Sequence, residues 1–235
     1  MYILPTLIDD PRYYDDKILS PEEILGYFDV YDALWLYDAN NPKAPHAELT
    51  SGKCSNGFFD CMRVLSNPNL CEIFALQLVR KLKENGVEKV NWVIGSSYGG
   101  ITFSYEVAKA FHAVHGFTEK APIPNSPKRM VWRRMTIPKD AVILQVEELI
   151  TTSRTLREVR RAVEEGNPEQ VNFLPIVGAL IHRPPKLPVN YGDIKIIALV
   201  ELEVRAVEQK DCPLCKIGSP RYRPKTNWKK LTGKV

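Results

Sequence analysis

The stretch VILQVEELITTSRT, residues 142–155, is the part of the chain from which the fold is most readily inferred. It begins with a short run of apolar, partly β-branched residues, a pattern typical of a strand buried on both faces of a parallel sheet. Two adjacent carboxylates, Glu147 and Glu148, end this run, and burying both without a partner would be costly. We therefore expect them at the carboxyl end of the strand, facing solvent, a cation or hydroxyl groups.

A loop rich in hydroxyl groups follows the acidic pair and leads into a helix. The loop residues that offer side-chain hydroxyls or backbone amides are Thr151, Thr152, Ser153, Arg154 and Thr155. Apolar residues at 156, 159 and 163 then recur at helical spacing, and Gly166 is the expected stop. Because amides and the dipole at a helix start attract phosphate, the segment predicts a sugar-phosphate pocket. The simpler alternative is an ordinary strand-to-helix turn with a solvated acidic pair.

The composition is that of a globular protein with one large domain or two small ones. The 235 residues are 44% hydrophobic and 26% charged, with a formal net charge of +4. The basic excess gathers near the C-terminus, where it is either a solvated tail or an anion-binding surface, and we find no basic face interleaved with aromatic residues that would indicate a nucleic-acid partner. With no long apolar run and an early acidic N-terminus, we expect a cytoplasmic protein without membrane contact. The five cysteines are then expected to be thiols or metal ligands.

Strands that alternate with helices predict an α/β fold with a mainly parallel, twisted sheet flanked by helices. Strands are expected at 90–94, 142–146, 171–181 and 194–204. Helices are expected from about 69 to 85, from the residues after 100 to Gly116, and after 153. Residues 1–45, with a helix start at Ser20, are interpreted as a small cap or hood, residues 46–205 as the α/β domain, and residues 206–235 as a basic tail.

A second loop has the properties of an anion cradle. Gly95-Ser-Ser-Tyr-Gly-Gly100 follows an expected strand and opens an expected helix, at the sheet edge where ligands bind in open α/β folds. Its glycines permit close backbone approach, and its amides and serines can receive anionic oxygens. It matches neither the dinucleotide fingerprint nor the P-loop. The alternative is that the glycines serve only tight packing of the turn. Together with the loop at 151–155, however, the segment predicts a substrate that bears a monophosphate and a diphosphate.

These segments resemble the type I phosphoribosyltransferases, and most closely the orotate phosphoribosyltransferase branch. Residues 142–155 match the family signature of four apolar residues, an acidic pair, an apolar residue, a spacer, two hydroxyl residues, small residues and a final Ser or Thr. Leu49–Asp60 is similar to the base-side segment of the orotate enzymes, in which SGR/K-x-S precedes paired aromatic residues. The resemblance covers residues 46–205 discontinuously.

The resemblance implies a magnesium-dependent enzyme that transfers the phosphoribosyl group of phosphoribosyl pyrophosphate to a nitrogenous base, orotate or a related pyrimidine, and releases pyrophosphate. It implies a homodimer, and magnesium held mainly through the substrate. Glu147 and Glu148 would take the ribose hydroxyls, and the loop at 151–155 the 5-phosphate. Lys53 would be a further catalytic residue, with Phe58 and Phe59 at the base. The implied pyrophosphate site comprises Gly95, Ser96, Ser97, Tyr98, Gly99 and Gly100, with Arg133 and Arg134 in addition.

The sequence departs from the family pattern at three places. Ser153 and Arg154 replace the usual glycines of the phosphate loop, and Gly99 stands where the orotate enzymes have a lysine. Residues 128–134 replace a mobile loop rich in Lys, Asp, His and Gly. The arginines at 129, 133 and 134 are either a substitute phosphate clamp or decoration of a strand edge. A non-catalytic sensor of phosphoribosyl pyrophosphate or nucleotides is thus an alternative to the enzyme, and a hydrolase is a third.

Cysteine and histidine residues outside these loops raise the question of a second metal. Cys212-Pro-Leu-Cys215 supplies half of a tetrahedral zinc site. The remaining ligands would come from Cys54, Cys61, Cys71, a histidine or another subunit, and a knuckle-like turn without metal is the alternative. His112 and His115, spaced i and i+3 on the helix expected to end at Gly116, are interpreted as surface residues. His46 and His182 have no acidic or cysteine neighbour in sequence that indicates catalysis.

Overall fold

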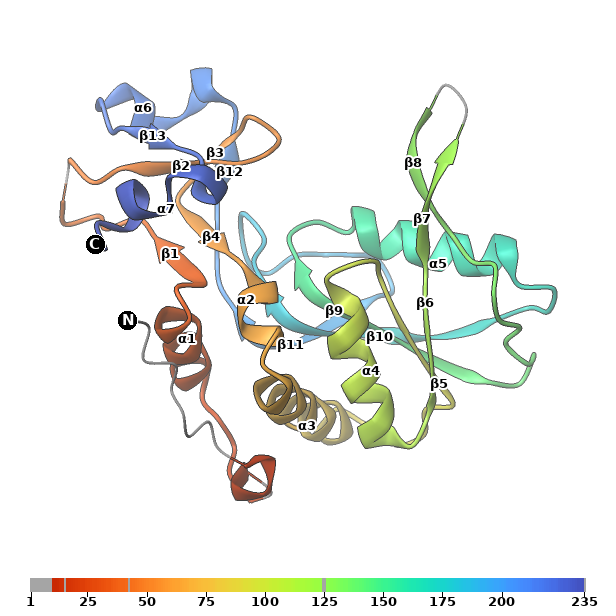
Figure 1. Ribbon diagram of the computed structural model, residues 1–235. Coiled ribbons are helices and arrows are strands. Elements are labelled where there is room, and N and C mark those ends of the chain that lie inside the picture. Colours follow the sequence, from red (N-terminus) through yellow and green to blue (C-terminus); the bar gives the residue numbers. More distant parts are fainter. Residues whose placement is uncertain (1–9, 15, 42, 124–125, 235) are drawn as a thin grey trace.

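In the computed structural model the chain forms an α/β body around a parallel sheet, with a smaller unit of short strands beside it (Figure 1). The structure describes residues 10–14, 16–41, 43–123 and 126–234. No helix in these ranges combines the length and the apolar character needed to cross a membrane. The predicted α/β class, with helices flanking a mainly parallel sheet, is confirmed.

The main sheet has five strands in the order β11-β10-β9-β5-β6, and all neighbouring strands are parallel. The bounds are β5 (Trp92–Gly95), β6 (Val114–Phe117), β9 (Val142–Ile150), β10 (Asn172–His182) and β11 (Lys195–Glu201). Since neighbouring parallel strands end at the same edge, the carboxyl ends of β5, β9 and β10 meet there. The acidic pair therefore lies on the central strand of that edge.

Helices cover both faces of the sheet (Figure 1). Contacts with one face come from α1 (Pro21–Val30), α3 (Pro68–Glu84) and α4 (Gly100–Phe111), whereas α5 (Arg154–Gly166) covers the other. Leu144 packs in the core of α3 and α4, while Ile143 packs against Val159 of α5. Because successive side chains of a strand point to opposite faces, β9 is buried on both sides, as its apolar run predicts.

Side-chain caps fix the starts of two helices. The Ser20 hydroxyl accepts a hydrogen bond from the Glu23 amide at 3.2 Å, and the Glu23 carboxylate accepts one from the Ser20 amide at 2.9 Å. This reciprocal pair is a capping box, and it confirms the helix start predicted at Ser20. At α3 the Asn67 side chain accepts hydrogen bonds from the amides of Asn69 and Leu70. These local bonds satisfy amides that the helix itself leaves open.

The helix after the glycine-rich loop is shorter than the sequence predicts. α4 ends at Phe111, because His112 adopts a left-handed conformation with φ of 54° and stops the helix without a glycine. Gly116, the predicted stop, lies in β6, where a Cβ would come within 2.5 Å of the Trp132 ring. His115 is thus a strand residue with a partly buried ring, and burial lowers its pKa to about 4. The interpretation of His112 and His115 as neighbours on one surface helix was wrong.

Segments from both ends of the chain build the smaller unit, which we call the hood and define as residues 34–59 and 206–232 (Figure 1). Its larger sheet has the order β12-β3-β2-β13, and its smaller sheet pairs β1 with β4. Residues 46–55 therefore pair with residues 206–222 of the predicted tail. The elements of the hood are β1 (Leu34–Leu36), β2 (His46–Glu48), β3 (Cys54–Ser55), β4 (Gly57–Phe59), β12 (Ala206–Val207), the 3-10 helix Gln209–Asp211, α6 (Pro213–Lys216), β13 (Arg221–Tyr222) and α7 (Pro224–Thr232).

The remaining elements lie on the body. An antiparallel hairpin of β7 (Glu119–Ile123) and β8 (Ser126–Val131) projects from it, in the place where the sequence departs from the mobile loop (Figure 1). The short helix α2 (Cys61–Leu65) leads from the hood into α3, and a 3-10 helix spans Pro11–Tyr14.

Candidate active site

Glu147 is buried near the carboxyl end of β9, with only 2% of its surface exposed. Its Oε2 accepts a hydrogen bond from the Ser96 hydroxyl at 2.5 Å, and its Oε1 accepts one from the Gln145 amide at 2.8 Å. Burial, together with repulsion from Glu148, raises the pKa of Glu147 to about 8, and the two hydrogen bonds only partly oppose this rise. The first carboxylate of the pair is therefore tied to the glycine-rich loop and protonated at neutral pH in the absence of a cation.

Glu148 lies under the glycine-rich loop. Burial raises the pKa of Glu148, and the charge of Lys120 opposes that rise. Its Oε2 is buried without a hydrogen-bond partner among the described residues. A Cβ on Gly99 would lie 2.2 Å from Oε1 of Glu148, and one on Gly100 would lie 3.1 Å from Oε2. The two glycines thus leave room for this carboxylate, and its open oxygen favours a ligand because a buried polar atom left unpaired costs about 1–3 kcal/mol.

The two predicted anion loops flank the acidic pair. Gly95 ends β5 and Gly100 begins α4, while Ser96 and Ser97 are buried, Tyr98 is exposed and the Ser97–Tyr98 peptide bond is cis. The loop at 151–155 joins β9 to the start of α5 at Arg154, and its residues 152, 154 and 155 are exposed. β5 and β9 are neighbours in the sheet. The structure therefore brings both loops and both glutamates to one edge, as predicted.

The base-side residues predicted in the hood have other partners. Lys53 Nζ lies 3.3 Å from Glu208 Oε1, in an ion pair between the two ends of the chain. The Phe58 ring packs edge-on against Trp228, with centroids 6.0 Å apart. Phe59 is buried against Phe28 in the main core, with centroids 5.8 Å apart. In the part of the chain that the structure describes, none of these three side chains contacts the acidic pair.

The predicted arginine clamp does not reach the glycine-rich loop in this structure. Arg134 pairs with Glu119, and Arg129 pairs with Glu165 near the end of α5. Arg133 lines a hollow with the last residues of α5. A helix of 13 residues is about 20 Å long, so this hollow lies far from the loop at which α5 begins. The role of these three arginines in phosphate binding stays a prediction.

Arg183 is a site residue that the sequence analysis did not single out. It follows β10 directly, and its amide donates to the Ile150 carbonyl at 2.8 Å, next to the end of β9. Its side chain is buried, burial lowers its pKa, and its Nε and Nη1 have no hydrogen-bond partner among the described residues. Burial raises the pKa of the Cys61 thiol well above its usual value, and the charge of Arg183 only partly opposes this rise. The Sγ of Cys61 lies 3.6 Å from the Glu148 carbonyl oxygen. A buried guanidinium with two unpartnered nitrogen atoms at this sheet edge is a binding group for an anion.

A second cation near the pair comes from the hairpin. Lys120 of β7 lies with Nζ 5.7 Å from the centre of the Tyr98 ring, and its charge acts on Glu148. It approaches the glycine-rich loop at the place where Gly99 lacks the family's lysine. The only sequence signal for Arg183 was positional, because a basic residue directly after a buried strand lies at the edge where ligands bind.

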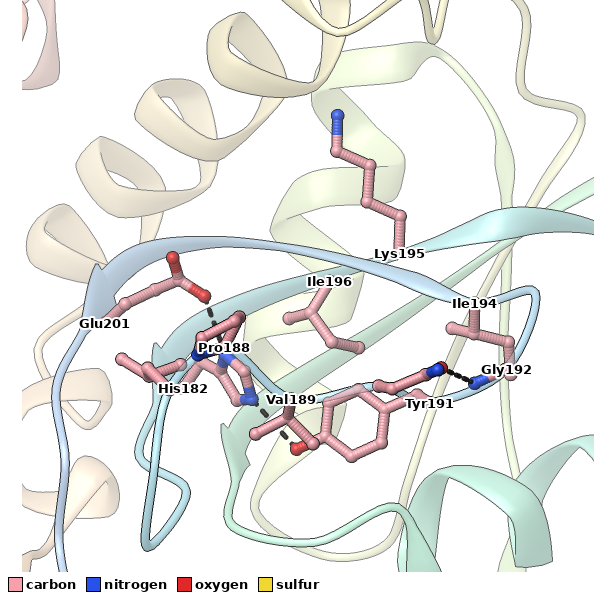
Figure 2. Close-up of a pocket in the computed structure, with 11 residues that line it drawn as sticks. His182, Pro188, Val189, Tyr191, Gly192, Ile194, Lys195, Ile196 and Glu201 are labelled. Atoms are coloured by element: carbon pink, nitrogen blue, oxygen red, sulfur yellow. Dashed lines mark hydrogen bonds and ion pairs between the residues drawn. The ribbon is translucent and has the colours of Figure 1, made fainter.

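A cavity of about 550 Å³ runs along β11 and the segment that follows Arg183, with residues 187–192 and Glu201 in its walls (Figure 2). His182 joins its walls, with Nδ1 2.7 Å from Glu201 Oε1 and Nε2 2.9 Å from the Tyr191 hydroxyl (Figure 2). None of the predicted site residues lines this cavity. The two hydrogen bonds hold the chain after β10 against the end of β11, so His182 helps to fix the position from which Arg183 extends.

Comparison with known proteins identifies the family. No family model matches the chain. The orotate phosphoribosyltransferase of Desulforamulus reducens is 33% identical over 206 residues, 88% of this chain and 97% of that protein. That of Pelotomaculum thermopropionicum is 33% identical over 179 residues, 76% of this chain and 87% of that protein. Among solved structures, orotate phosphoribosyltransferase from Aeropyrum pernix covers 76% of this chain and 93% of its own, with a TM-score of 0.54 and 14% identity, which supports the fold. The chain is a phosphoribosyltransferase and belongs to the orotate phosphoribosyltransferase family.

Proposed function

We propose that this protein transfers the phosphoribosyl group of phosphoribosyl pyrophosphate to orotate, with magnesium, and releases pyrophosphate. The names of its relatives support the donor and the acceptor. The observation that carries the proposal is the buried guanidinium of Arg183 at the sheet edge that holds Glu147 and Glu148, because its Nε and Nη1 have no hydrogen-bond partner among the described residues. A neutral base would leave that charge without a partner, whereas the carboxylate of orotate would satisfy it.

The acidic pair holds the ribose in this proposal. Glu147 and Glu148 accept hydrogen bonds from the sugar hydroxyls, while the amides at the start of α5 receive the 5-phosphate. Displacement at the anomeric carbon passes through an oxocarbenium-like state, so positioning and charge stabilisation are sufficient and no protein nucleophile is needed. Glu147 has a pKa of about 8 and is therefore protonated before the ligand binds. In this proposal it releases its proton to solvent when the sugar and its counter-ion bind.

The oxygen donors at this edge suit magnesium. The unpartnered Oε2 of Glu148 is a hard oxygen ligand of the kind that magnesium prefers, either directly or through water, with diphosphate and ribose oxygens as the other donors. When bound, magnesium neutralises the charge that develops on the leaving pyrophosphate. The glycine-rich loop supplies backbone amides, and Lys120 supplies a positive charge where the family has a lysine at the position of Gly99. The absence of a lysine at Gly99 was one reason for the sensor alternative, and in this proposal Lys120 supplies the missing charge.

The base is recognised from the side of Cys61 and Arg183. The guanidinium of Arg183 presents a fork of N–H groups that matches a planar carboxylate. Cys61 directly follows the base-side segment Leu49–Asp60, and its thiol lies against the backbone of Glu148. The residue directly after that segment, rather than Phe58 or Phe59, therefore contacts the backbone of the acidic pair.

The test is turnover with a panel of bases. The protein is incubated with phosphoribosyl pyrophosphate, magnesium and either orotate, uracil, adenine or nicotinate, and pyrophosphate release is followed. We expect release with orotate, none in excess chelator, and at least a hundredfold lower kcat/KM with uracil, which lacks the carboxylate. Turnover of another base in preference to orotate would overturn the acceptor, and tight donor binding without turnover of any base would overturn the enzymatic proposal.

A further inference from the structure

Three cysteines and one histidine of the hood converge from separate segments of the chain. His46 lies on β2, Cys54 on β3, and Cys212 and Cys215 flank the start of α6. Their ligand atoms all lie within 4.8 Å of one another. Cys54 Sγ lies 3.6 Å from Cys215 Sγ, and His46 Nε2 lies 3.3 Å from Cys215 Sγ and 3.8 Å from Cys212 Sγ.

These separations fit the edges of a metal tetrahedron. Zinc binds sulfur at about 2.3 Å and imidazole nitrogen at about 2.0 Å, which places tetrahedral ligand atoms about 3.5–3.8 Å apart. His46, Cys54 and Cys212 are buried and Cys215 is partly buried, so the four groups enclose the space between them. Three thiols and an imidazole form one of the ligand sets typical of structural zinc.

The surroundings of His46 select the correct nitrogen. The Ser219 hydroxyl donates to the Ala44 carbonyl at 2.6 Å, so its oxygen is left to accept a hydrogen bond. Nδ1 of His46 lies 2.9 Å from that oxygen and must therefore carry the proton. The lone pair then resides on Nε2, which faces the thiols of Cys212 and Cys215. Metal-bound histidines are commonly oriented through their second nitrogen in this way.

The sulfur atoms have donors suited to thiolates. The Cys215 amide lies 3.5 Å from Cys212 Sγ, in a tight turn that Gly218 completes with φ of 79°. Arg221 Nη1 lies 4.0 Å from Cys54 Sγ. Three thiolates around a divalent ion leave a net charge of −1, and the Arg221 guanidinium offsets it. Cys212 and Cys54 would not need these N–H donors if their thiols stayed neutral.

We propose that His46, Cys54, Cys212 and Cys215 bind one structural zinc ion that joins the two ends of the chain in the hood. Binding displaces the three thiol protons, and all four positions are protein ligands, so no position remains open for catalysis. The hood strands are only two or three residues long, which is too little pairing for an independent sheet. The ion supplies the cross-link that such short strands lack.

Metal content of the full-length protein is the first test. The protein is produced with zinc in the medium, freed of loosely bound metal on a desalting column, and analysed by mass spectrometry of the elements. We expect one zinc per chain. Replacement by cobalt is expected to give the thiolate-to-cobalt absorption bands of a tetrahedral site. Wild-type protein that is folded but metal-free, or that holds any two of these cysteines as a disulfide, would overturn the proposal.

Matched variants assign the ligands. Cys54→Ser and Cys215→Ser are expected to lose stoichiometric zinc and the cobalt bands, whereas Cys71→Ser, a buried cysteine of α3 outside the cluster, keeps both. Ser219→Ala, which removes only the partner of His46 Nδ1, is expected to weaken zinc affinity about 10–100-fold. A Cys54→Ser protein that retains one zinc with an unchanged cobalt spectrum would overturn the ligand set. If the ligand variants do not fold, the metal content of the wild type and of Ser219→Ala decides the matter.

Discussion

Burial has two opposing effects on Glu147 in the ligand-free protein. It holds the side chain in the position that a ligand needs, and it makes the charged form of the carboxylate unfavourable. The hydrogen bonds from Ser96 and Gln145 hold the carboxylate in place, yet its pKa is raised to about 8. Ligand-free protein therefore carries a proton at this site that a sugar and a cation must displace. Adjacent carboxylates at the end of an apolar strand were a sufficient sequence signal for this arrangement.

We expect the ligand-free protein to lose stability as the pH rises from about 5 to 8. The pKa of Glu147 is about 8 in the folded state and near 4.5 in the unfolded state, so in this window the folded state binds more protons than the unfolded state. The free energy of unfolding must then fall with rising pH. Thermal unfolding measured across this range should show a downward trend that Glu147→Gln flattens and that the exposed control Glu88→Gln leaves in place. An equal slope in the Glu147→Gln protein would contradict the assignment.

Arg183 yields a prediction about the acceptor alone. Charge-assisted hydrogen bonds contribute about 1.5–3 kcal/mol, so Arg183→Ala is expected to raise the KM for orotate about 10–100-fold. The affinity for phosphoribosyl pyrophosphate should stay within about twofold, and the melting temperature should not fall, because the variant removes a buried charge without a partner. Arg161→Ala, a surface variant on α5, is the control for kinetics. Equal losses for donor and acceptor would show that Arg183 acts on the fold rather than on the base.

The sequence analysis found the acidic pair but not Arg183, and the difference has a physical reason. Two adjacent glutamates after an apolar run conflict with burial, and this conflict is visible in the sequence. Arg183 matters because its guanidinium is buried and its Nε and Nη1 find no hydrogen-bond partner in the part of the chain that the structure describes, and this property depends on the packing of several segments. A lone arginine after a strand has many ordinary explanations in a sequence.

At the scale of the element, strands and helices of regular periodicity were predictable. The apolar run of β9 and the helical spacing of α3 and α5 appear in the structure within a few residues of the expected bounds. The end of α4 was missed because His112 takes a left-handed conformation that usually belongs to glycine. The pairing of residues 46–55 with residues 206–222 was not predicted, because strands of two or three residues are too short to show an alternating pattern.

The turn between β5 and α4 carries a prediction of its own. Gly99→Ala would place a methyl group 2.2 Å from the present position of Glu148 Oε1, so the flexible carboxylate must turn away. We expect affinity for phosphoribosyl pyrophosphate to fall about tenfold, a loss of one hydrogen bond at roughly 1.4 kcal/mol, with little change in melting temperature. Gly26→Ala on α1, where nothing lies within 4 Å, is the matched control and should keep full affinity. Unchanged donor affinity in Gly99→Ala would argue against a role for Glu148 in the ribose site.

At the scale of the whole molecule, the hood has a small core of its own, although its Leu34 and Phe59 pack in the core of the body. Trp35, Ala47 and Leu231 form the buried centre of the hood, with Phe58 and Trp228 packed against it. The body is centred on the main sheet and its helices. Composition predicted a basic tail where the structure has strands and helices that complete this second core. The homodimer and the cytoplasmic location remain predictions from the family and the composition.

Because the hood has a core of its own, we expect a substitution in that core to destabilise the hood more than the body. Leu231→Ala should cost about 2–5 kcal/mol of local stability, because it truncates a side chain that is 2% exposed. Hydrogen exchange followed by mass spectrometry should show faster exchange in residues 34–59 and 206–232, with β9 and α3 still protected. Ile217→Ala, at an exposed position of the same segment, is the control. Uniformly faster exchange across the main sheet would mean that the two units unfold together.

The pairing of β2 with β13 sets an order of events on the ribosome. The hydrogen bond between His46 and Ser219 joins residues 173 positions apart, so at 5–20 residues per second the second partner is synthesised roughly 9–35 seconds after the first. All strands of the main sheet have been translated by Glu201, before any of residues 206–232. A nascent chain can therefore complete its body while β2 and β3, which pair with each other, still lack their outer partners β13 and β12. The hood is then the last part of the nascent protein to fold. Until Cys212 and Cys215 are synthesised, Cys54 can react with oxidants or bind metals other than the proposed zinc.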